Sequence, residues 1–238
     1  MGFFRLVSAL FPCLFLWSAA ATEAAPLSSF HARYDVELRG LRVASLTRIF
    51  TLKPDGSYEF ESVLQSEGVA ALVKPVTERE ISRGHWQADG PRPTSYEYLK
   101  QSGKKHRAAR ADFDWQSKIV SGQDNGKRWQ AALVPGIVDK LTHQLLLMRD
   151  LARGTQLEYR VADDGRIKTQ RWSRAVADDL QVGGKTFPVV KITHEGRGGR
   201  QTRLWCAPEL SYLPVGIEYQ EKNGEVTSAR LRLRRDVP

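Results

Sequence analysis

The chain has 238 residues, of which 41% are hydrophobic, and it carries 36 Lys and Arg against 27 Asp and Glu, a formal net charge of +9. The hydrophobic content is enough for a core, and the positive charge favours anionic partners. No apolar run after residue 17 approaches the about 20 residues that a membrane-spanning helix needs. We therefore expect no transmembrane segment in the mature protein.

The first 21 residues have the pattern of a secretory signal peptide. Arg5 supplies the positive charge, Leu6 to Trp17 is apolar apart from Ser8 and Pro12, and small residues follow. This order of segments is typical of export followed by cleavage. Ala19-Ala20-Ala21 predicts a mature start near Thr22, with cleavage after Ala20 or Ala25 as alternatives. We expect residues 22–238 to form one β-rich domain in the periplasm.

Cleavage would remove one of the two cysteines. Cys13 lies in the leader, and the residues before it do not match a lipoprotein cleavage site. The remaining Cys206 has no partner for an intramolecular disulfide. It shares one face of a predicted strand with Leu204, so we expect its thiol to be buried and unreactive.

The mature chain reads mainly as antiparallel β-strands. Apolar and polar residues alternate from Phe30 to Leu38, which is the two-residue period of a half-buried strand. Turn sequences such as Lys53-Pro54-Asp55-Gly56 and Asn223-Gly224 recur along the chain at intervals of roughly 8 to 14 residues. We predict a large curved antiparallel sheet, a half-barrel or open barrel.

Two stretches interrupt the strands. Gly68 to Lys74 reads as a short helix or an apolar loop. Ile137 to Arg153 has apolar residues at three- and four-residue spacing and is followed by Gly154, which predicts a helix with a left-handed cap. This helix is apolar on nearly every side, so we expect it to pack on the concave side of the sheet.

Several motifs of the mature chain resemble the DUF3108 family of exported bacterial proteins. They are Phe30-x-x-x-Tyr34, Phe113-Asp114-Trp115, Asp139-x-Leu141-Thr142, Leu157-x-Tyr159-Arg160-Val161, Leu204-Trp205-x-Ala207-Pro208 and Leu213-Pro214-Val215. The resemblance covers essentially the whole mature chain and implies no assigned function. The last two motifs are also similar in rhythm to the sheets of periplasmic lipoprotein carriers, which are half-barrels that hold acyl chains beneath a lid.

An apolar groove between sheet and helix is one interpretation of the residues near Pro208 and Pro214. The groove would be lined by six residues: Leu141, Leu145, Met148, Trp205, Tyr212 and Leu213. The other interpretation is that these side chains fill the core and pack the corner onto the sheet edge. Lys104, Lys105, Arg107 and Arg110 are candidates for contact with an anionic surface, and their lack of interleaved aromatic residues argues against nucleic acid.

Catalytic motifs are absent from the sequence. It contains no Gly-x-Ser-x-Gly, His-Glu-x-x-His, phosphate loop or Cys-x-x-Cys, and no spacing typical of a metal site. We expect Asp139 and His143 to form a surface pair and Asp112 and Asp114 to be solvated. We therefore predict no catalytic residues, cofactor or metal. Three hypotheses remain: a protein that binds a lipid, acylated or other apolar ligand, a structural or adaptor component of the cell envelope with a filled core, and an unrecognised hydrolase.

Overall fold

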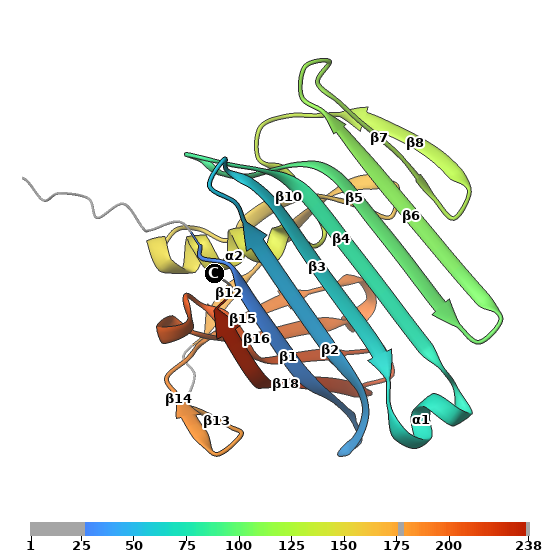
Figure 1. Ribbon diagram of the computed structural model, residues 1–238, viewed down its shortest axis with the longest axis vertical. Coiled ribbons are helices and arrows are strands. Elements are labelled where there is room, and N and C mark those ends of the chain that lie inside the picture. Colours follow the sequence, from blue (N-terminus) through green and yellow to red (C-terminus); the bar gives the residue numbers. More distant parts are fainter. Residues whose placement is uncertain (1–26, 176–178, 237–238) are drawn as a thin grey trace, which may run out of the picture.

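Strand β1 (Phe30–Leu38) lies in the interior of a large antiparallel sheet, between β18 and β2, and its apolar side chains all point to one face. The structure is a computed structural model, and it describes residues 27–175 and 179–236. The predicted signal peptide lies outside the described residues. In Figure 1 the sheet curves around the elements behind it and remains open.

The main sheet contains 13 strands, and the order of neighbours places β12 at one edge and β8 at the other. Every neighbouring pair is antiparallel, as the turn spacing predicted. From edge to edge the strands are β12 (Ser173–Ala175), β15 (Val190–Glu195), β16 (Gln201–Ala207), β17 (Leu213–Gln220), β18 (Val226–Asp236), β1, β2 (Leu41–Leu52), β3 (Ser57–Ser66), β4 (Val76–Gln87), β5 (Gly90–Ser102), β6 (Lys105–Asp114), β7 (Ile119–Asp124) and β8 (Lys127–Ala132).

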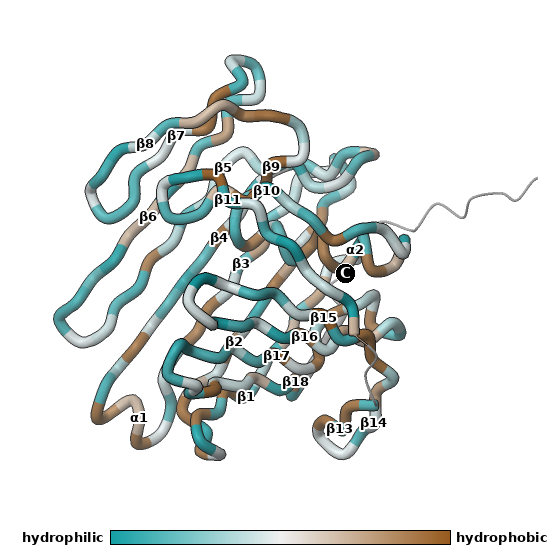
Figure 2. The backbone as a smooth tube through the Cα atoms, turned by 180° about the vertical axis from the view of Figure 1, so that it is seen from behind, coloured by the Kyte–Doolittle hydropathy of each residue, from teal (hydrophilic) through white to brown (hydrophobic). Residues whose placement is uncertain are grey.

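Two smaller sheets accompany the main one. Strands β9 (Ile137–Asp139), β10 (Glu158–Asp163) and β11 (Arg166–Arg171) form one of them, and β13 (Leu180–Val182) and β14 (Lys185–Phe187) form a separate hairpin. Viewed from behind, β9, β10 and β11 lie together with helix α2 (His143–Arg153) across the hollow side of the main sheet (Figure 2). Two single 3-10 turns, η1 (Arg197–Gly199) and η2 (Pro208–Leu210), complete the elements.

Helix α2 (His143–Arg153) is shorter than the predicted helix from Ile137 to Arg153. Ile137 to Asp139 instead pair in parallel with β10, which suits the β-branched Ile137 and Val138. The helix begins only at His143 because the Asp139 carboxylate accepts the backbone N–H groups of the turn that precedes it. The predicted end is confirmed: Gly154 has φ 70° and closes the helix in the left-handed conformation.

The core contains α2 on the concave side of the sheet, as predicted. Leu145 and Met148 pack with the inward-facing Phe30, Phe50 and Phe60 of the sheet. The opposite side of α2 is covered by a second group of buried side chains from β10, β15 and β16, among them Ile192, Leu204 and Cys206. The predicted burial of Cys206 is confirmed, and burial raises the pKa of its thiol.

Helix α1 (Gly68–Val73) links β3 to β4 at the opposite end of the strands from the β2–β3 turn (Figure 1). The sequence left a short helix and an apolar loop as alternatives here, and the structure contains the helix. None of its residues is buried. Figure 2 shows apolar colouring along this short segment at the lower end of the molecule.

Candidate functional site

The carboxylate of Asp139 is buried and holds the start of α2 against the sheet. Its Oδ1 accepts the backbone N–H groups of Leu141 and Thr142, both at 2.8 Å. Its Oδ2 accepts the hydroxyl of Ser82 in β4 at 2.6 Å and that of Thr142 at 2.7 Å. Burial raises the pKa of Asp139, and these hydrogen bonds act in the opposite direction. All of its acceptor positions are occupied by the protein, so Asp139 is a structural anchor.

His143 does not form the expected surface pair with Asp139, because both side chains are inside the protein. Its ring lies 4.7 Å from that of Tyr159 and 5.8 Å from that of Trp172, centroid to centroid. Burial lowers the pKa of His143 to about 3, and the nearby His194 acts in the same direction. Within the described residues its Nε2 has no hydrogen-bond partner. The imidazole is therefore a neutral core group with no carboxylate to orient it.

The six residues of the predicted groove do not surround an open space. Leu141, Leu145, Met148 and Leu213 are buried in the main core, and Leu145 and Leu213 are completely inaccessible. Tyr212 is half-buried against both groups of core residues. The space between α2 and the sheet is filled by their side chains.

Trp205 points away from the other five groove residues. Its ring is contacted on the outer face of the sheet by Lys191 and Arg230, each 5.3 Å from the ring centroid. Arg230 alternates along β18 with the buried Ala229 and Leu231, which identifies this face as the outer one. The alternation in this strand carried the signal for the separation, because Trp205 lies on the opposite face from the buried Leu204 and Cys206.

A polar cleft of about 350 Å³ lies beside α2, between the helix and the β4–β5 turn. Asp150 accepts hydrogen bonds there from Arg149 Nε at 2.6 Å and from the Tyr159 hydroxyl at 3.0 Å. Arg149 also donates to the backbone oxygen of Asp89. Burial raises the pKa of Tyr159, and the negative charge of Asp150 adds to the effect. These contacts connect α2 to the β4–β5 turn.

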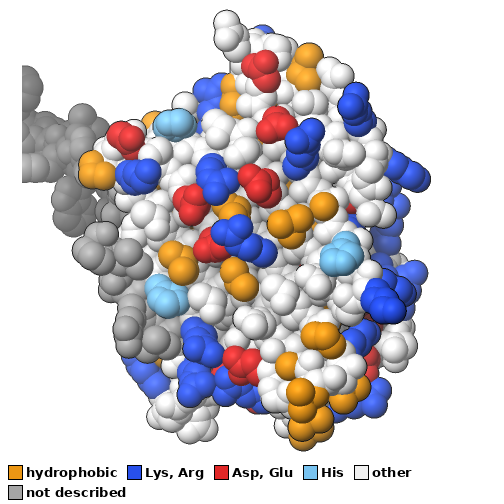
Figure 3. All heavy atoms as spheres, turned by 45° about the vertical axis from the view of Figure 1, so that its right-hand side comes forward, with side chains coloured by type: hydrophobic (Ala, Val, Ile, Leu, Met, Phe, Trp, Pro, Cys, Tyr) orange, Lys and Arg blue, Asp and Glu red, His pale blue; other side chains and the backbone are white. Residues whose placement is uncertain are grey.

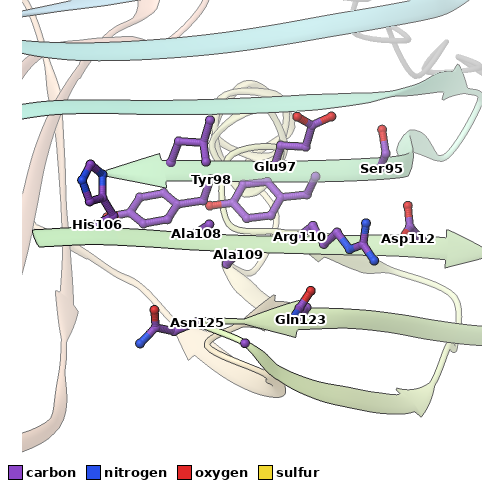
Figure 4. A pocket seen from close by; sticks show the side chains of 13 residues that line it. Ser95, Glu97, Tyr98, His106, Ala108, Ala109, Arg110, Asp112, Gln123 and Asn125 are labelled. Atoms are coloured by element: carbon purple, nitrogen blue, oxygen red, sulfur yellow. The ribbon is translucent and has the colours of Figure 1, made fainter. Parts of the chain in front are cut away.

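A shallow groove of about 630 Å³ lies on the outer face of β5, β6 and β7. Figure 4 shows Ser95 and Glu97 on β5 beside Arg110 and Asp112 on β6, with Gln123 on β7 and Asn125 in the turn that follows it. The lining includes the small side chain of Ala108. Its lining carries both signs of charge.

The four candidate basic residues lie on different parts of the surface. Arg110 lies in the outer groove, whereas Arg107 has the opposite position in the β6 alternation and forms ion pairs with Asp124 at 3.2 Å and Asp164 at 2.7 Å. These two carboxylates raise the pKa of Arg107. Lys104 and Lys105 lie in and after the exposed β5–β6 turn. The four therefore do not form one basic surface.

An apolar hollow of about 380 Å³ lies at the lower end of the sheet, beside α1. Its walls come from the inward-facing ends of β1, β2, β3, β4 and β18 and from α1 itself. The lining residues are Val36, Leu38, Val43, Ala44, Leu64, Ser66, Ala70, Val73, Lys74, Val76 and Thr227. Below we call this space the α1 hollow.

Position and contacts explain why α1 borders this hollow. The backbone N–H of Glu67 donates to the oxygen of Val43 in β2 at 2.9 Å, and the Ser66 hydroxyl accepts the N–H of Val76 at 2.9 Å. These bonds hold the start and the end of the β3–β4 connection against the neighbouring strands at this end of the sheet. Ala70 and Val73 then face the hollow. The sequence signal for this site was the run Gly68 to Val73, which contains no polar residue, and our sequence analysis did not assign it a function.

The described residues contain no group of three His, Cys, Asp or Glu arranged to hold a metal ion. Within the same residues, no helix is long and apolar enough to cross a membrane.

These features define a barrel-like β protein with an open sheet, an internal helix and an apolar hollow at one end. The chain belongs to the family described as "Protein of unknown function (DUF3108)", whose model matches residues 33–231. This confirms the resemblance found in the sequence motifs. No curated protein matches the chain.

A solved structure has a similar fold. It is the crystal structure of a beta-barrel-like protein of the domain of unknown function DUF1849 from Brucella abortus. The TM-score is 0.61 at 10% sequence identity, and the match covers 90% of this chain and 99% of the Brucella chain. At this identity the likeness concerns the fold alone, and it supports the barrel-like architecture.

Proposed function

We propose that this protein binds an apolar chain, such as the acyl chain of a lipid, in the α1 hollow. The observation that carries the proposal is the hollow itself, which is lined mainly by aliphatic side chains and is bordered by an exposed apolar helix. On this proposal the protein is a binding protein without catalytic activity. It would act in the periplasm after cleavage near Thr22.

The size and chemistry of the hollow suit such a ligand. Ligand sites typically have volumes of roughly 300 to 1,000 Å³, and this one has about 380 Å³. Each methylene group that moves from water into an apolar site contributes about 0.8 kcal/mol. A chain of several methylene groups would therefore bind without any specific hydrogen bond, and Lys74 at the mouth would suit an anionic head group.

The proposed site differs from the groove predicted from the sequence. That groove would have used α2, whose apolar side chains are instead covered from both sides. We therefore keep the predicted class of ligand but assign it to the α1 hollow, which has different lining residues. A helix that remains exposed beside a hollow is a better candidate for ligand contact than a helix that is already enclosed.

A structural or adaptor role is the second candidate, and the filled core around α2 favours it. A protein of that kind needs a closed, stable core and no vacant apolar site. The two candidates differ in whether the α1 hollow takes up a ligand from solution, and a binding measurement separates them.

The test is titration of the purified protein with a fatty acid that carries an environment-sensitive fluorophore, followed by competition with unlabelled dodecanoic acid. We expect saturable binding that Thr227→Trp weakens at least tenfold, because the indole would occupy the hollow. Thr51→Trp is the matched control, since Thr51 lies in β2 and does not line the hollow. Equal binding by Thr227→Trp and the unchanged protein would contradict the proposed site. Absence of binding would favour the adaptor role.

A further inference from the structure

Four large aliphatic side chains protrude into solvent at the lower end of the molecule. They are Leu41 at the start of β2 and Val69, Leu72 and Val73 in α1, with exposed fractions of 71%, 75%, 86% and 80%. Single exposed apolar residues are ordinary, but a contiguous exposed group marks an interaction surface. Figure 3 shows hydrophobic side chains gathered at the lower edge, with Lys and Arg side chains next to them. We call these four residues the apolar tip.

The geometry of α1 places three of these side chains together. Val69, Leu72 and Val73 have the three- and four-residue spacing that puts residues on one side of a helix. Leu41 joins them because the residue before α1 is hydrogen-bonded to Val43, two residues further along β2. The tip thus comes from the start of β2 and from the β3–β4 connection, which are adjacent in space.

Three lysines lie beside the apolar tip. Lys74 directly follows α1, Lys104 lies in the β5–β6 turn and Lys105 is the first residue of β6. The β5–β6 turn is attached to the β3–β4 connection by a hydrogen bond of 3.1 Å from Gly103 N to Pro75 O. All three are exposed, and within residues 27–175 and 179–236 none of them forms an ion pair.

The two carboxylates that flank the β3–β4 connection in the chain, Glu67 and Glu78, are paired with other residues. Glu67 is paired with Arg33 at 3.1 Å and is also in contact with Arg42. Glu78 is paired with Lys100 at 2.8 Å. The lower end therefore combines an apolar projection with unpaired positive charge.

We infer that the apolar tip docks onto the surface of an anionic phospholipid bilayer. The aliphatic side chains enter the boundary between head groups and acyl chains, and the three lysines meet lipid phosphates. Burial of apolar side chains together with attraction to anionic lipid is the usual combination for peripheral membrane binding. The inference adds a partner to the proposed function, because docking here would bring the mouth of the α1 hollow to the lipid.

Local contact with the bilayer can be measured with a fluorophore on the tip. In a Cys13→Ser background the buried Cys206 is the remaining thiol, so Leu72→Cys can be labelled selectively with an environment-sensitive NBD group. Leu99→Cys is the control, because Leu99 is 53% exposed on β5 and is not part of the tip. We expect vesicles of phosphatidylcholine and phosphatidylglycerol in equal amounts to shift the emission of the label at residue 72 to the blue and to leave that at residue 99 unchanged. A label shift at residue 99 alone, or at neither residue, would overturn the inference.

Vesicle sedimentation tests the charge. A lysine close to an anionic surface contributes about 1 kcal/mol, so loss of two should weaken binding on the order of 30-fold. We expect this for Lys104→Gln with Lys105→Gln and no such loss for Lys53→Gln with Lys118→Gln, which remove the same charge at other positions. Both double variants retain the apolar residues 6–17, which add the same background binding to vesicles in each variant. The difference between the two variants therefore measures the lysines alone. Equal losses in the two double variants would overturn the role of these lysines.

Different measurements test the membrane inference and the proposed function, so one can be wrong while the other holds. Thr227→Trp should abolish uptake of the fatty acid from solution and leave the NBD response to vesicles intact. If the tip enters vesicles but the protein takes up no fatty acid, the docking surface stands without the ligand site. If the fatty acid binds but the label at residue 72 does not respond to vesicles, docking is wrong and the hollow stands.

Discussion

In the part of the chain that the structure describes, the two α-helices both carry clustered apolar residues but have opposite environments. Every residue from His143 to Met148 in α2 is buried, whereas none of the residues of α1 is. Helix α2 follows a turn that the buried Asp139 carboxylate holds and ends at the left-handed Gly154, whereas α1 ends at Lys74, which has an extended φ of −147°. One helix stabilises the core, and the other presents apolar surface at the rim. We therefore expect substitutions around α2 to lower the stability of the fold and substitutions in α1 to affect binding instead. The following predictions test this contrast.

The largest effect on stability is expected from removal of the Asp139 carboxylate. Asp139→Ala should lower the free energy of unfolding by about 3 to 5 kcal/mol, because two hydroxyls and two backbone N–H groups lose their acceptor inside the protein. Urea denaturation measures the change. Asp112→Ala, at an exposed position on β6, should cost less than about 0.5 kcal/mol. Similar values for the two variants would contradict the anchoring role of Asp139.

The neutral His143 should make the protein sensitive to acid. Its pKa in the folded state is lowered to about 3 by burial, below the ordinary value of about 6.5. Stability is therefore fully present above the unfolded value and is lost as the pH falls, by about 1.4 kcal/mol per pH unit from 6.5 towards 3. We expect His143→Phe to reduce the slope of unfolding free energy against pH in this range, and His106→Phe, at an exposed position, to retain it. An unchanged slope in His143→Phe would show that His143 is not the titrating group.

A smaller loss of stability is expected from truncation of Cys206. Its side chain belongs to the second buried group, which covers the side of α2 that faces away from Phe30, Phe50 and Phe60. Cys206→Ala should lower the free energy of unfolding by about 1 to 2 kcal/mol through the small cavity that it leaves. The thiol of the unchanged protein should react with an alkylating reagent only after denaturation, because its pKa is raised and it is 1% exposed. Fast alkylation of the native protein would contradict this burial.

The smallest stability effect should come from the apolar tip. Leu72→Asp with Val73→Asp should change the free energy of unfolding by less than about 0.5 kcal/mol, because both side chains are already in water. The same variant should lose insertion into anionic vesicles. A large loss of stability would mean that α1 contributes to the core, and the contrast between the two helices would then fail.

Much of the fold follows from local pattern. The alternation in Phe30–Leu38 predicted β1 and its buried face, and the spacing of turn residues predicted a large antiparallel sheet. The all-round apolar run Leu145 to Met148 predicted a helix enclosed by the sheet. These features depend on neighbouring residues and on burial, so they can be read from one chain.

The site was harder to predict because it depends on contacts between distant segments. Asp139 and His143 are one helical turn apart in a continuous helix, and this favoured a surface pair. The parallel pairing of Ile137 to Asp139 with β10 removed that turn and placed the carboxylate beside Ser82, which is 57 residues away in the chain. Local spacing carries no information about such a partner.

By itself, the sequence determined the class of fold, the enclosed helix, the burial of Cys206 and the presence of an apolar segment from Gly68 to Val73. Each of these follows from residue periodicity or composition over a short stretch. Only the tertiary structure decided that the space around Leu145 is filled and that α1 stands exposed beside a hollow. The physical reason is that an apolar side chain is equally suited to a core and to a ligand site, and the choice depends on whether other segments reach it.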